Sequence, residues 1–372
     1  MKFKKLFLFL AAVFGVLAIA SCNKKDDTHT HTFETAWTSD DTYHWHKSTC
    51  GHDEVSGKEE HKWGEGKLGP DGKVFTCTVC GKTKTVNIGI ETITLSAPKG
   101  APAIAVASLA KVKEENYNFV AATNISSELA KATATSDFVI APINAGAKLY
   151  KLGKSEYKLA AVVTWGNLYF ASQKANFSLN DINGNKITLF GQNSINASIA
   201  NYVLAQKGIT PSSVEYVAEA ADTQTLLASD ANAIVLCAEP AISAAKLKKP
   251  NITSISVQTL YKELTGNDGF TQAGLFVSPK AISEKKKDVV DRYILEVAES
   301  IVKCSSNLNE VAQICVDLKL LPNLDVAKSA IPLCSVKFMK AIDAKTQIET
   351  TANIDLSQFG GALPVEEFYY QF

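Results

Sequence analysis

Two short pieces of the sequence carry thiol and imidazole groups at spacings that suit a metal ion. One has the form His46-Lys-Ser-Thr-Cys50-Gly and the other has the form Cys77-Thr-Val-Cys80-Gly. In each piece the final glycine allows backbone N–H groups to turn toward a bound thiolate. A Cys-x2-Cys pair with a second pair about thirty residues away is close to the spacing of tetrahedral zinc sites. We therefore predict a zinc site formed by His46, Cys50, Cys77 and Cys80.

Other histidines are further candidates for this site. His44 and His46 flank Trp45, and in a strand two such side chains face the same side, so that either can reach a metal ion. His52 and His61 remain candidates as well. The spacing alone does not choose among them.

Residues 33–90 form a small module with three open roles. Its few aromatic side chains make a scant core, and a domain this small usually needs a staple. The staple is either a structural zinc ion or a disulfide between Cys77 and Cys80 that leaves Cys50 free, and an oxidising compartment favours the disulfide. The third role is the capture of metal ions from the surroundings.

The charge and residue types of the chain weigh against several classes of function. Lys and Arg number 38, and Asp and Glu number 38, so no excess of positive charge indicates a nucleic-acid partner. All 6 histidines lie before residue 62, and the only arginine is Arg292. Chemistry after residue 90 must therefore proceed without imidazole and almost without guanidinium. No nucleophile–base pair, phosphate loop or pair of carboxylates stands out there, so we expect no catalytic residues and no enzyme.

The amino end has the three regions of a secretory signal. Lysines within the first five residues precede an apolar run that is too short for an ordinary membrane span. The run closes on Ile-Ala-Ser-Cys22, which resembles the lipobox of bacterial lipoproteins. The resemblance implies that residues 1–21 are removed and that Cys22 is acylated, which would hold the protein on the extracytoplasmic face of a membrane through a tether, 22–32. The alternative is a plain signal peptide with an incidental cysteine.

From residue 91 onward, predicted strands and helices alternate. A strand around Ile93 and Leu95 leads through a turn into an apolar helix, and further strands are predicted at 118–122, 137–141 and 157–164. This rhythm is typical of a mostly parallel sheet, in which the turns that follow the strands meet at one edge. The turns that would offer groups to a small ligand are 98–102, 142–144 and 165–167.

Several segments of this unit follow one another in an order that is found in one family. The second-lobe segment is Leu179-Asn-Asp181-Ile-Asn-Gly-Asn-Lys186-Ile. The others are Ala141-Pro-Ile-Asn144 with Leu149-Tyr150, Ala238-Glu239-Pro240, and Gly360-Gly-Ala-Leu-Pro364 with Phe368-Tyr-Tyr370. Together they resemble the solute-binding proteins of nitrate-, sulfonate- and taurine-type ABC importers, over roughly residues 91–372. The small module resembles short zinc-ribbon-like His/Cys repeats near the amino ends of some bacterial surface lipoproteins.

The resemblance implies an α/β, two-lobed type II periplasmic binding protein fold, preceded by a small β-rich module of metal-binding type. The implied lobes are 91–172 with 273–372, and 173–272, with crossings near 170–177 and 272–278. Such a protein closes by hinge motion on a small molecule and presents it to the permease and ATPase of an ABC importer. We expect a monomer that needs no cofactor for transport, with zinc confined to the small module.

The predicted cleft is lined by residues that follow strands. They are Lys99, Gly100, Asn144, Trp165, Gly166, Gln192, Asn193, Ser194 and Glu239. The donors of 191–194 at a helix start suit a carboxylate or another small anion, and Glu239 suits an amine. Each choice has a structural alternative: a solvated Lys99, a core Trp165, a helix cap at Asn193 or Ser194, and a surface or hinge role for Glu239.

The single arginine narrows the ligand class. Families that grip carboxylate, sulfonate or phosphate often use a bidentate guanidinium, whereas Arg292 is predicted on the solvated face of a helix. An uncharged, zwitterionic or aromatic ligand is therefore favoured over a strongly anionic one. Cys304 and Cys315 either meet across a helix hairpin or stay free. The pairing of Cys237 and Cys334 is left open as well.

The favoured function is thus a lipid-anchored solute-binding protein of an ABC importer. Two alternatives remain. One is a surface lipoprotein in which metal capture by the small module is the primary activity. The other is an enzyme built on the same fold.

Overall fold

The computed structural model describes residues 29–69, 72–89, 91–130 and 135–372. The signal segment and the predicted lipidation site, Cys22, lie outside the described residues. The chain divides into two compact units, a small one up to Thr85 and a large one, Val86–Phe372, to which Leu68–Lys73 also belongs. Within the described part of the chain, no helix has the length and apolar character needed to span a bilayer.

Short strands form two sheets between residues 38 and 86, and the pairs β1–β2 and β2–β3 are antiparallel. One sheet has the order β1-β2-β3, and the other has the order β4-β5-β6. The strands are β1 (Thr38–Ser39), β2 (Tyr43–Lys47), β3 (Val55–Glu60), β4 (Lys67–Gly69), β5 (Gly72–Thr76) and β6 (Thr83–Val86). The predicted β-rich character is confirmed, and the strands are short because their sequences contain few consecutive apolar residues.

The first lobe of the large unit is built on a six-stranded mixed sheet with the order β17-β10-β16-β9-β7-β8. Its strands are β7 (Leu95–Pro98), β8 (Tyr117–Val120), β9 (Phe138–Pro142), β10 (Lys158–Thr164), β16 (Ala273–Val277) and β17 (Val336–Lys340). The central strands β9, β10 and β16 are almost entirely buried and mostly apolar, as expected for a sheet that helices cover on both faces.

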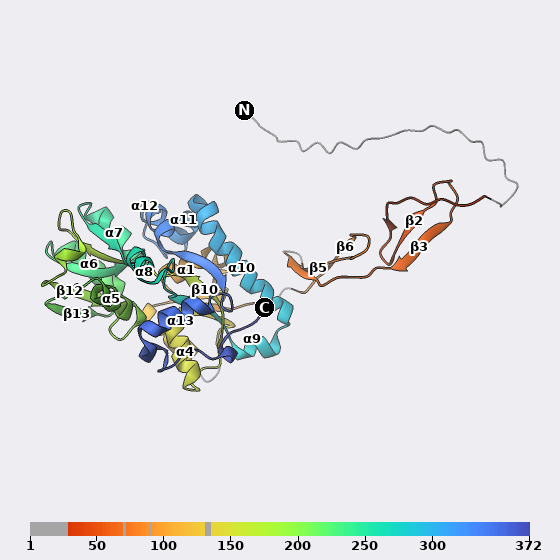
Figure 1. Ribbon diagram of the computed structural model, residues 1–372. Helices are drawn as coiled ribbons and strands as arrows, with labels where there is room; N and C mark the ends of the chain where they lie inside the picture. The colour runs from red at the N-terminus through yellow and green to blue at the C-terminus, as the bar shows by residue number, and fades with distance from the viewer. Residues whose placement is uncertain (1–28, 70–71, 90, 131–134) are drawn as a thin grey trace, which may run out of the picture. The chain divides into compact units, whose positions relative to one another are not determined.

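The second lobe has a five-stranded sheet with the order β13-β12-β14-β11-β15. Its strands are β11 (Leu168–Ser172), β12 (Lys186–Phe190), β13 (Ser213–Val217), β14 (Ile234–Ala238) and β15 (Thr253–Ser256). In Figure 1 the elements of this lobe, in green and teal, gather on one side of the large unit, and the segments that precede and follow it in sequence share the other side. The predicted two-lobed α/β fold is confirmed.

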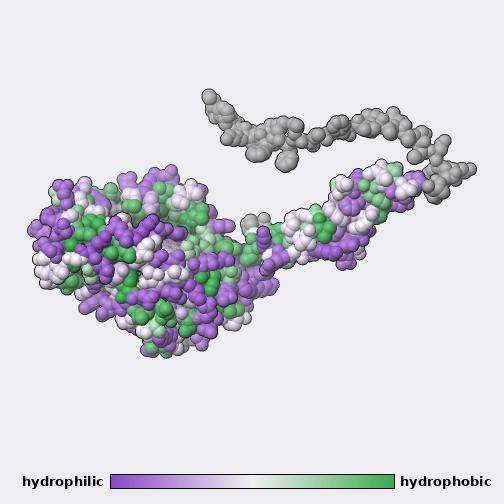
Figure 2. Space-filling view, in the orientation of Figure 1, coloured by the Kyte–Doolittle hydropathy of each residue, from purple (hydrophilic) through white to green (hydrophobic). Residues whose placement is uncertain are grey.

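Helices fill the connections between strands. Those of the first lobe are α1 (Ala101–Ala105), α2 (Ala107–Ala110), α3 (Ile125–Leu129), α4 (Ile143–Lys151), α9 (Pro279–Glu284), α10 (Lys287–Ser306), α11 (Leu308–Asp317), α12 (Leu324–Ala330) and α13 (Lys345–Ile354). Those of the second lobe are α5 (Ile195–Gln206), α6 (Ala220–Ser229), α7 (Ala241–Lys248) and α8 (Val257–Thr265). Apolar and polar residues are interspersed over the face of the large unit that Figure 2 shows.

The chain crosses between the lobes earlier than predicted. β10 belongs to the first sheet and ends at Thr164, whereas β11 already pairs with β14 and β15 of the second sheet. The outgoing crossing is therefore 165–167 rather than 170–177. The return lies between α8 and β16, so the predicted 272–278 is largely β16 itself. The predicted crossing was wrong because β10 and β11 are both apolar runs, and an apolar run does not show to which sheet a strand belongs.

The strand directions bring the carboxyl edges of the two sheets face to face. β10 and β9 are both antiparallel to β16, and β9 is parallel to β7, so these three strands end at the same edge. In the second sheet β12 and β14 are parallel, and β11 begins beside the end of β14, with Leu168 opposite Ala238. Because only residues 165–167 join β10 to β11, the two carboxyl edges must meet along this line.

Candidate functional site

Four donor atoms converge in the small unit, and we call the residues that carry them the inner cluster. They are His44, His61, Cys77 and Cys80, and their ligand atoms all lie within 4.8 Å of one another. Cys80 Sγ is 3.4 Å from His61 Nδ1, and Cys77 Sγ is 4.0 Å from His44 Nδ1. Two thiols and two imidazoles at these separations are the donor set of a tetrahedral zinc site.

The inner cluster is also the core of the small unit. Within its described residues, 29–67 and 74–85, the buried residues are His44, His61 and Cys77. Polar ligands gain little from leaving water unless they are paired, so this core contributes little apolar burial to stability. The burial therefore favours a structural metal ion as the group that these residues surround.

The protonation states of the inner cluster fit metal binding. His61 Nε2 donates to the backbone carbonyl of Asp40 at 2.9 Å, which leaves Nδ1 available toward the thiols. Burial raises the pKa of Cys77, but hydrogen bonds from the N–H groups of Cys80 and Val79 outweigh it and lower the pKa to about 6. A thiol with this pKa is a thiolate at neutral pH, the form that binds metals.

A second group, which we call the outer cluster, consists of His29, His31, Cys50 and His52. Cys50 Sγ lies 3.4 Å from His29 Nε2, 3.2 Å from His31 Nδ1 and 3.5 Å from His52 Nδ1. A hydrogen bond from Ser48 and a further one from His29 lower the pKa of Cys50 to about 5. Unlike the inner cluster, all four residues are at least partly exposed.

The grouping predicted from sequence spacing differs from the structure. Cys50 lies in the outer cluster, Cys77 and Cys80 lie in the inner cluster, and His46 belongs to neither. The pairing of β2 with β3 is irregular between His44 and His46, and both rings lie against Trp37, at 4.6 Å and 3.8 Å between ring centroids. His46 Nδ1 lies 3.1 Å from the Ala36 carbonyl, and His46 therefore has a structural contact in place of a metal-ligand position.

The cysteines of the described residues are free thiols, so neither the Cys77–Cys80 nor the Cys304–Cys315 disulfide is formed. Cys304, Cys315 and Cys334 share one apolar cluster, and burial raises the pKa of each thiol. Burial also raises the pKa of Cys237, to about 11. These four therefore act as small apolar side chains.

In the large unit, the turns where the carboxyl edges of the two sheets meet form what we call the interlobe seam. It comprises 99–100, 143–144, 165–167, 191–194 and 239–240, and all of the predicted cleft residues lie in these turns. The lobes touch here, since a Cβ atom on Gly100 would lie 3.9 Å from Pro240 Cδ. Beside the seam, Ser198 Oγ on α5 donates to Asp355 Oδ2 at 2.6 Å.

Several polar side chains of the seam are buried. Asn144 is 8% exposed and Asn167 is 4% exposed, and among the described residues the Oδ1 atoms of both have no hydrogen-bond partner. The Nδ2 group of Asn167 donates to the Glu239 carbonyl at 2.8 Å, which ties β10–β11 to the end of β14. A buried amide oxygen without a donor costs about 1–3 kcal/mol, so the two oxygens favour a ligand that carries N–H or O–H groups.

Glu239 is held by the first turn of α7. Its carboxylate accepts hydrogen bonds from the N–H and the hydroxyl of Ser243 at 3.3 Å and 3.0 Å. Burial raises the pKa of this carboxyl to about 7, and the Ser243 hydrogen bonds offset part of the effect. At neutral pH the group is therefore partly protonated and can either donate or accept a hydrogen bond.

Other predicted cleft residues have structural roles. Trp165 Nε1 donates to the Lys337 carbonyl at 2.9 Å, and the buried Trp165 ring belongs to the apolar cluster that runs through both lobes. Ser194 Oγ accepts from Ala197 N at 3.4 Å and so caps α5. The remaining exposed members of the set are Lys99, Gln192 and Asn193.

Sequence reasoning did not single out Asn167, which lies in the seam, or Gln258, which contacts it. Asn167 lies in a turn that was predicted to face the ligand, so its polarity was the available signal. Gln258 lies on α8, donates to the carbonyls of Trp165 and Gly166, and has a buried Oε1 without a partner in the described structure. Nothing in the local sequence around Gln258 indicates this contact.

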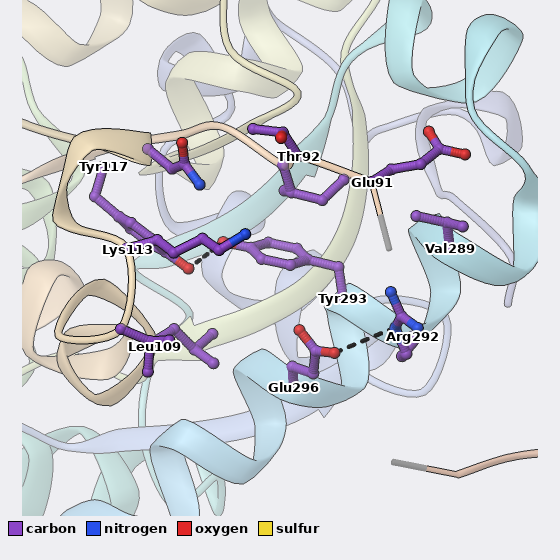
Figure 3. Close-up of a pocket in the computed structure, with 12 residues that line it drawn as sticks. Glu91, Thr92, Leu109, Lys113, Tyr117, Val289, Arg292, Tyr293 and Glu296 are labelled. Atoms are coloured by element: carbon purple, nitrogen blue, oxygen red, sulfur yellow. Dashed lines mark hydrogen bonds and ion pairs between the residues drawn. The ribbon is translucent and has the colours of Figure 1, made fainter. Parts of the chain in front are cut away.

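A separate pocket lies in the first lobe near the amino end of β7, the strand end opposite to the seam (Figure 3). Arg292 lines it and pairs with Glu296 at 3.2 Å, with 16% of its side chain exposed. The prediction that Arg292 lies on a solvated helix face is therefore wrong, because its side chain is mostly buried in the wall of this pocket. Because it lies away from the seam, no guanidinium is available to a ligand held there.

Comparison with known proteins finds neither a matching family model nor a matching curated sequence. Solved structures do match. An ABC transporter protein from Parabacteroides distasonis is 18% identical, with a TM-score of 0.63 over 76% of this chain and 99% of that chain.

Two further structures cover the same share of this chain, 76%. The ligand-binding component of an ABC-type import system from Staphylococcus aureus, solved with zinc bound, is 12% identical over 97% of its length, with a TM-score of 0.60. The periplasmic aliphatic sulphonate binding protein SsuA from Escherichia coli is 14% identical over 93% of its length, with a TM-score of 0.58. At these identities the likeness establishes the fold, and the chain has the architecture of periplasmic binding proteins.

Proposed function

We propose that the protein is a solute-binding component of an ABC importer, anchored by lipid on Cys22 at the extracytoplasmic face of a membrane. The large unit would capture a small molecule in the interlobe seam and present the closed form to a permease and its ATPase. The architecture supports this role because two lobes joined by short crossings can open and close as rigid bodies. Three structures with the same fold are described as parts of ABC transport or binding systems.

One observation carries the proposal. The carboxyl edges of two sheets face each other, and buried amide oxygens of Asn144 and Asn167 at that junction have no partner among the described residues. In open α/β sheets, ligands bind outside the carboxyl ends of the strands. Unpaired polar atoms cost stability in a closed protein, and a ligand that supplies donors would remove this cost.

The seam also indicates the ligand class. Asn144 and Asn167 offer acceptors, Glu239 offers a carboxyl group with a pKa of about 7, and the arginine lies elsewhere. Such a set suits an uncharged, zwitterionic or aromatic molecule that carries N–H groups better than a strong anion, which usually needs a bidentate guanidinium.

The experiment is a thermal-shift screen of the purified protein at neutral pH. The panel contains amino acids, pyrimidines and aromatic amines in one arm and alkanesulfonates, nitrate and phosphate in the other. We expect stabilisation by a member of the first arm, which adds about 2.7 kcal/mol at one hundred times Kd. Asn144→Leu should remove the shift, and Gln313→Ala, an exposed position on α11 whose side chain bonds Asp317 of the same helix, should keep it. Stabilisation by the second arm alone would contradict the ligand class, and catalytic turnover of the hit would contradict the binding role.

Anchoring is tested separately, because it does not depend on the ligand. A bacterial host fed radiolabelled palmitate should label the wild-type chain, which should then partition into detergent. Cys22→Ser should abolish both, whereas Cys50→Ser should change neither. Labelling that persists in Cys22→Ser would exclude this anchor.

We also propose that the inner cluster holds a structural zinc ion. The support is the donor set, two cysteines and two histidines within 4.8 Å, together with the near absence of other buried side chains in the small unit. The ion would be bound by His44, His61, Cys77 and Cys80. It would connect β2, which carries His44, to the turn between β5 and β6, which carries both cysteines. Metal analysis of the purified protein and of Cys80→Ser tests this role.

A further inference from the structure

The small unit contains the same backbone arrangement twice. In the first copy, Glu34 N donates to Lys47 O at 2.8 Å and Thr49 N donates to Thr32 O at 2.8 Å. In the second copy, Gly64 N donates to Thr76 O at 2.9 Å and Thr78 N donates to Lys62 O at 2.8 Å.

Two more contacts repeat. Phe33 bridges Ser48 as Trp63 bridges Cys77, and the threonine hydroxyl of each copy donates to the same carbonyl at 3.1 Å. The two copies are therefore related in register and not only in composition.

Each copy brings a histidine and a cysteine to the same corner. Two residues before the bridging aromatic stands His31 in the first copy and His61 in the second, and each lies within 3.4 Å of a thiol, Cys50 or Cys80. A glycine with positive φ follows each cysteine, 81° at Gly51 and 76° at Gly81. The repeated turn thus presents the same pair of ligands whether the site is buried or exposed.

The copies differ in how the other two ligands are supplied. In the second copy they are Cys77 and His44, and His44 comes from β2 of the first copy. In the first copy they are His29 and His52, one on each flank of the turn. His29 and His31 are two residues apart in extended chain, so both rings can point to one side. Gly51 turns the chain so that His52 Nδ1 lies 3.1 Å from His29 Nε2.

The separations in the outer cluster match the edges of one coordination tetrahedron. For Zn–S of about 2.3 Å and Zn–N of about 2.0–2.1 Å, the edges are about 3.5 Å for S···N and about 3.3 Å for N···N. The observed S···N distances are 3.2, 3.4 and 3.5 Å, and the N···N distance is 3.1 Å. Four of the six donor separations thus fit one tetrahedron, and the four donors come from two stretches of chain, 29–31 and 50–52.

Hydrogen bonds alone do not account for this arrangement. Three ring nitrogens lie within 3.5 Å of Cys50 Sγ, but His29 Nε2 and His52 Nδ1 also lie 3.1 Å from each other. One of these two nitrogens must accept if they bond to each other, so the three rings cannot all donate to a Cys50 thiolate while that contact is also a hydrogen bond. Water competes for each of these polar groups because all four residues are at least partly exposed. A single divalent cation would use all four lone pairs at once.

We propose that His29, His31, Cys50 and His52 form a second metal site, which binds a divalent cation of the zinc type and exchanges it with the surroundings. Three imidazoles and one thiolate suit Zn²⁺ and Co²⁺ and disfavour Mg²⁺ and Ca²⁺, which prefer oxygen ligands. Exposure makes this ion accessible to competing ligands, whereas the buried inner cluster holds its ion as part of the core. The small unit would then carry one structural and one exchangeable metal ion, independently of any ligand in the interlobe seam.

The first test counts metal ions on the purified protein after loading with Zn²⁺ and gel filtration. We expect two zinc ions per chain in the wild type, one in Cys50→Ser and two in His46→Gln, the matched control on the same hairpin. One ion in the wild type that Cys50→Ser leaves unchanged would overturn the proposal. Cys80→Ser acts on the inner cluster and so on the fold of the whole small unit, whereas Cys50→Ser isolates the outer site.

The second test measures release of zinc to a chromogenic chelator. We expect two phases of equal amplitude, with the fast phase at least tenfold faster and absent from Cys50→Ser. With Co²⁺ in place of zinc, the ion lost first should carry about half of the thiolate charge-transfer absorbance of the ion that remains, because one thiolate binds it instead of two. Release of both ions in one phase would show that the outer ion does not exchange on its own.

Discussion

The small and large units owe their folds to different interactions. The large unit has extended apolar clusters, with residues such as Leu95, Phe170 and Phe276 fully buried. In the described residues of the small unit, the buried positions are three of the inner-cluster ligands. Burial of apolar surface stabilises the large unit, whereas the small unit has little such surface. Under the zinc assignment proposed above, one chain combines a metal-dependent fold with a metal-independent one.

Metal removal is the strongest way to separate the two units. Structural zinc contributes on the order of 10 kcal/mol to folding, so chelation at neutral pH should unfold residues 29–85 and leave 91–372 folded. Hydrogen exchange read by mass spectrometry localises the effect, and Cys304→Ala, a free thiol of the large unit, serves as the control that keeps its metal. A metal-free protein whose small unit remains protected would break the comparison.

Glu239 should make the stability of the large unit depend on pH. Its folded pKa is about 7 against an ordinary value of 4.5, so the folded state holds the proton more tightly. The contribution of Glu239 to the free energy of unfolding is complete below about pH 4.5. It is lost as the pH rises from there through 7, by about 3 kcal/mol in all.

Glu239→Gln should flatten this part of the pH profile, as measured by urea unfolding between pH 4 and pH 9. Its metal content should not change. An identical slope in wild type and variant would show that Glu239 titrates normally.

The outgoing crossing should require glycine at position 166, because a side chain there would clash with its neighbours. Gly166 has φ of 68°, and a Cβ there would lie 2.4 Å from the Phe270 ring. Gly166→Ala should therefore cost about 1–3 kcal/mol of stability, because both the backbone and the ring must move.

Gly184→Ala is the matched control, since φ is 71° but nothing lies within 4 Å of the added Cβ. It should cost about 1 kcal/mol, from backbone strain alone. Equal losses in the two variants, measured by denaturant unfolding, would remove the steric argument at Gly166.

The smallest expected effect concerns the hydrogen bond between the lobes. Ser198→Ala removes the donor to Asp355 Oδ2, whereas Asp355 Oδ1 keeps its hydrogen bond from the Ser357 hydroxyl. We expect a loss of about 1 kcal/mol, seen as faster dissociation of whichever small molecule the screen identifies. Ser329→Ala, whose hydroxyl bonds its own helix at Asp325 O, should leave dissociation unchanged.

Much of the large unit was predictable because local patterns determine its elements. The predicted strand 157–164 is β10, Lys158–Thr164, and the predicted strand 137–141 is β9, Phe138–Pro142. The apolar helix after Pro102 proved to be two short helices that meet at Val106, and Pro98 belongs to the end of β7. Such boundaries depend on packing against neighbouring segments, which the local sequence does not report.

By itself, the sequence determined the α/β alternation, the order of the lobes, and the confinement of histidine to the small unit, because these follow from composition and from periodic patterns along the chain. The tertiary structure decided which histidine meets which cysteine. His44 lies with Cys77 in the inner cluster, whereas His46 packs against Trp37 and joins neither cluster, so the ligand sets depend on contacts between segments rather than on spacing within one. Likewise, the direction of β11 placed Asn167 and Glu239 together, since contacts between strand ends exist only once the sheets have formed.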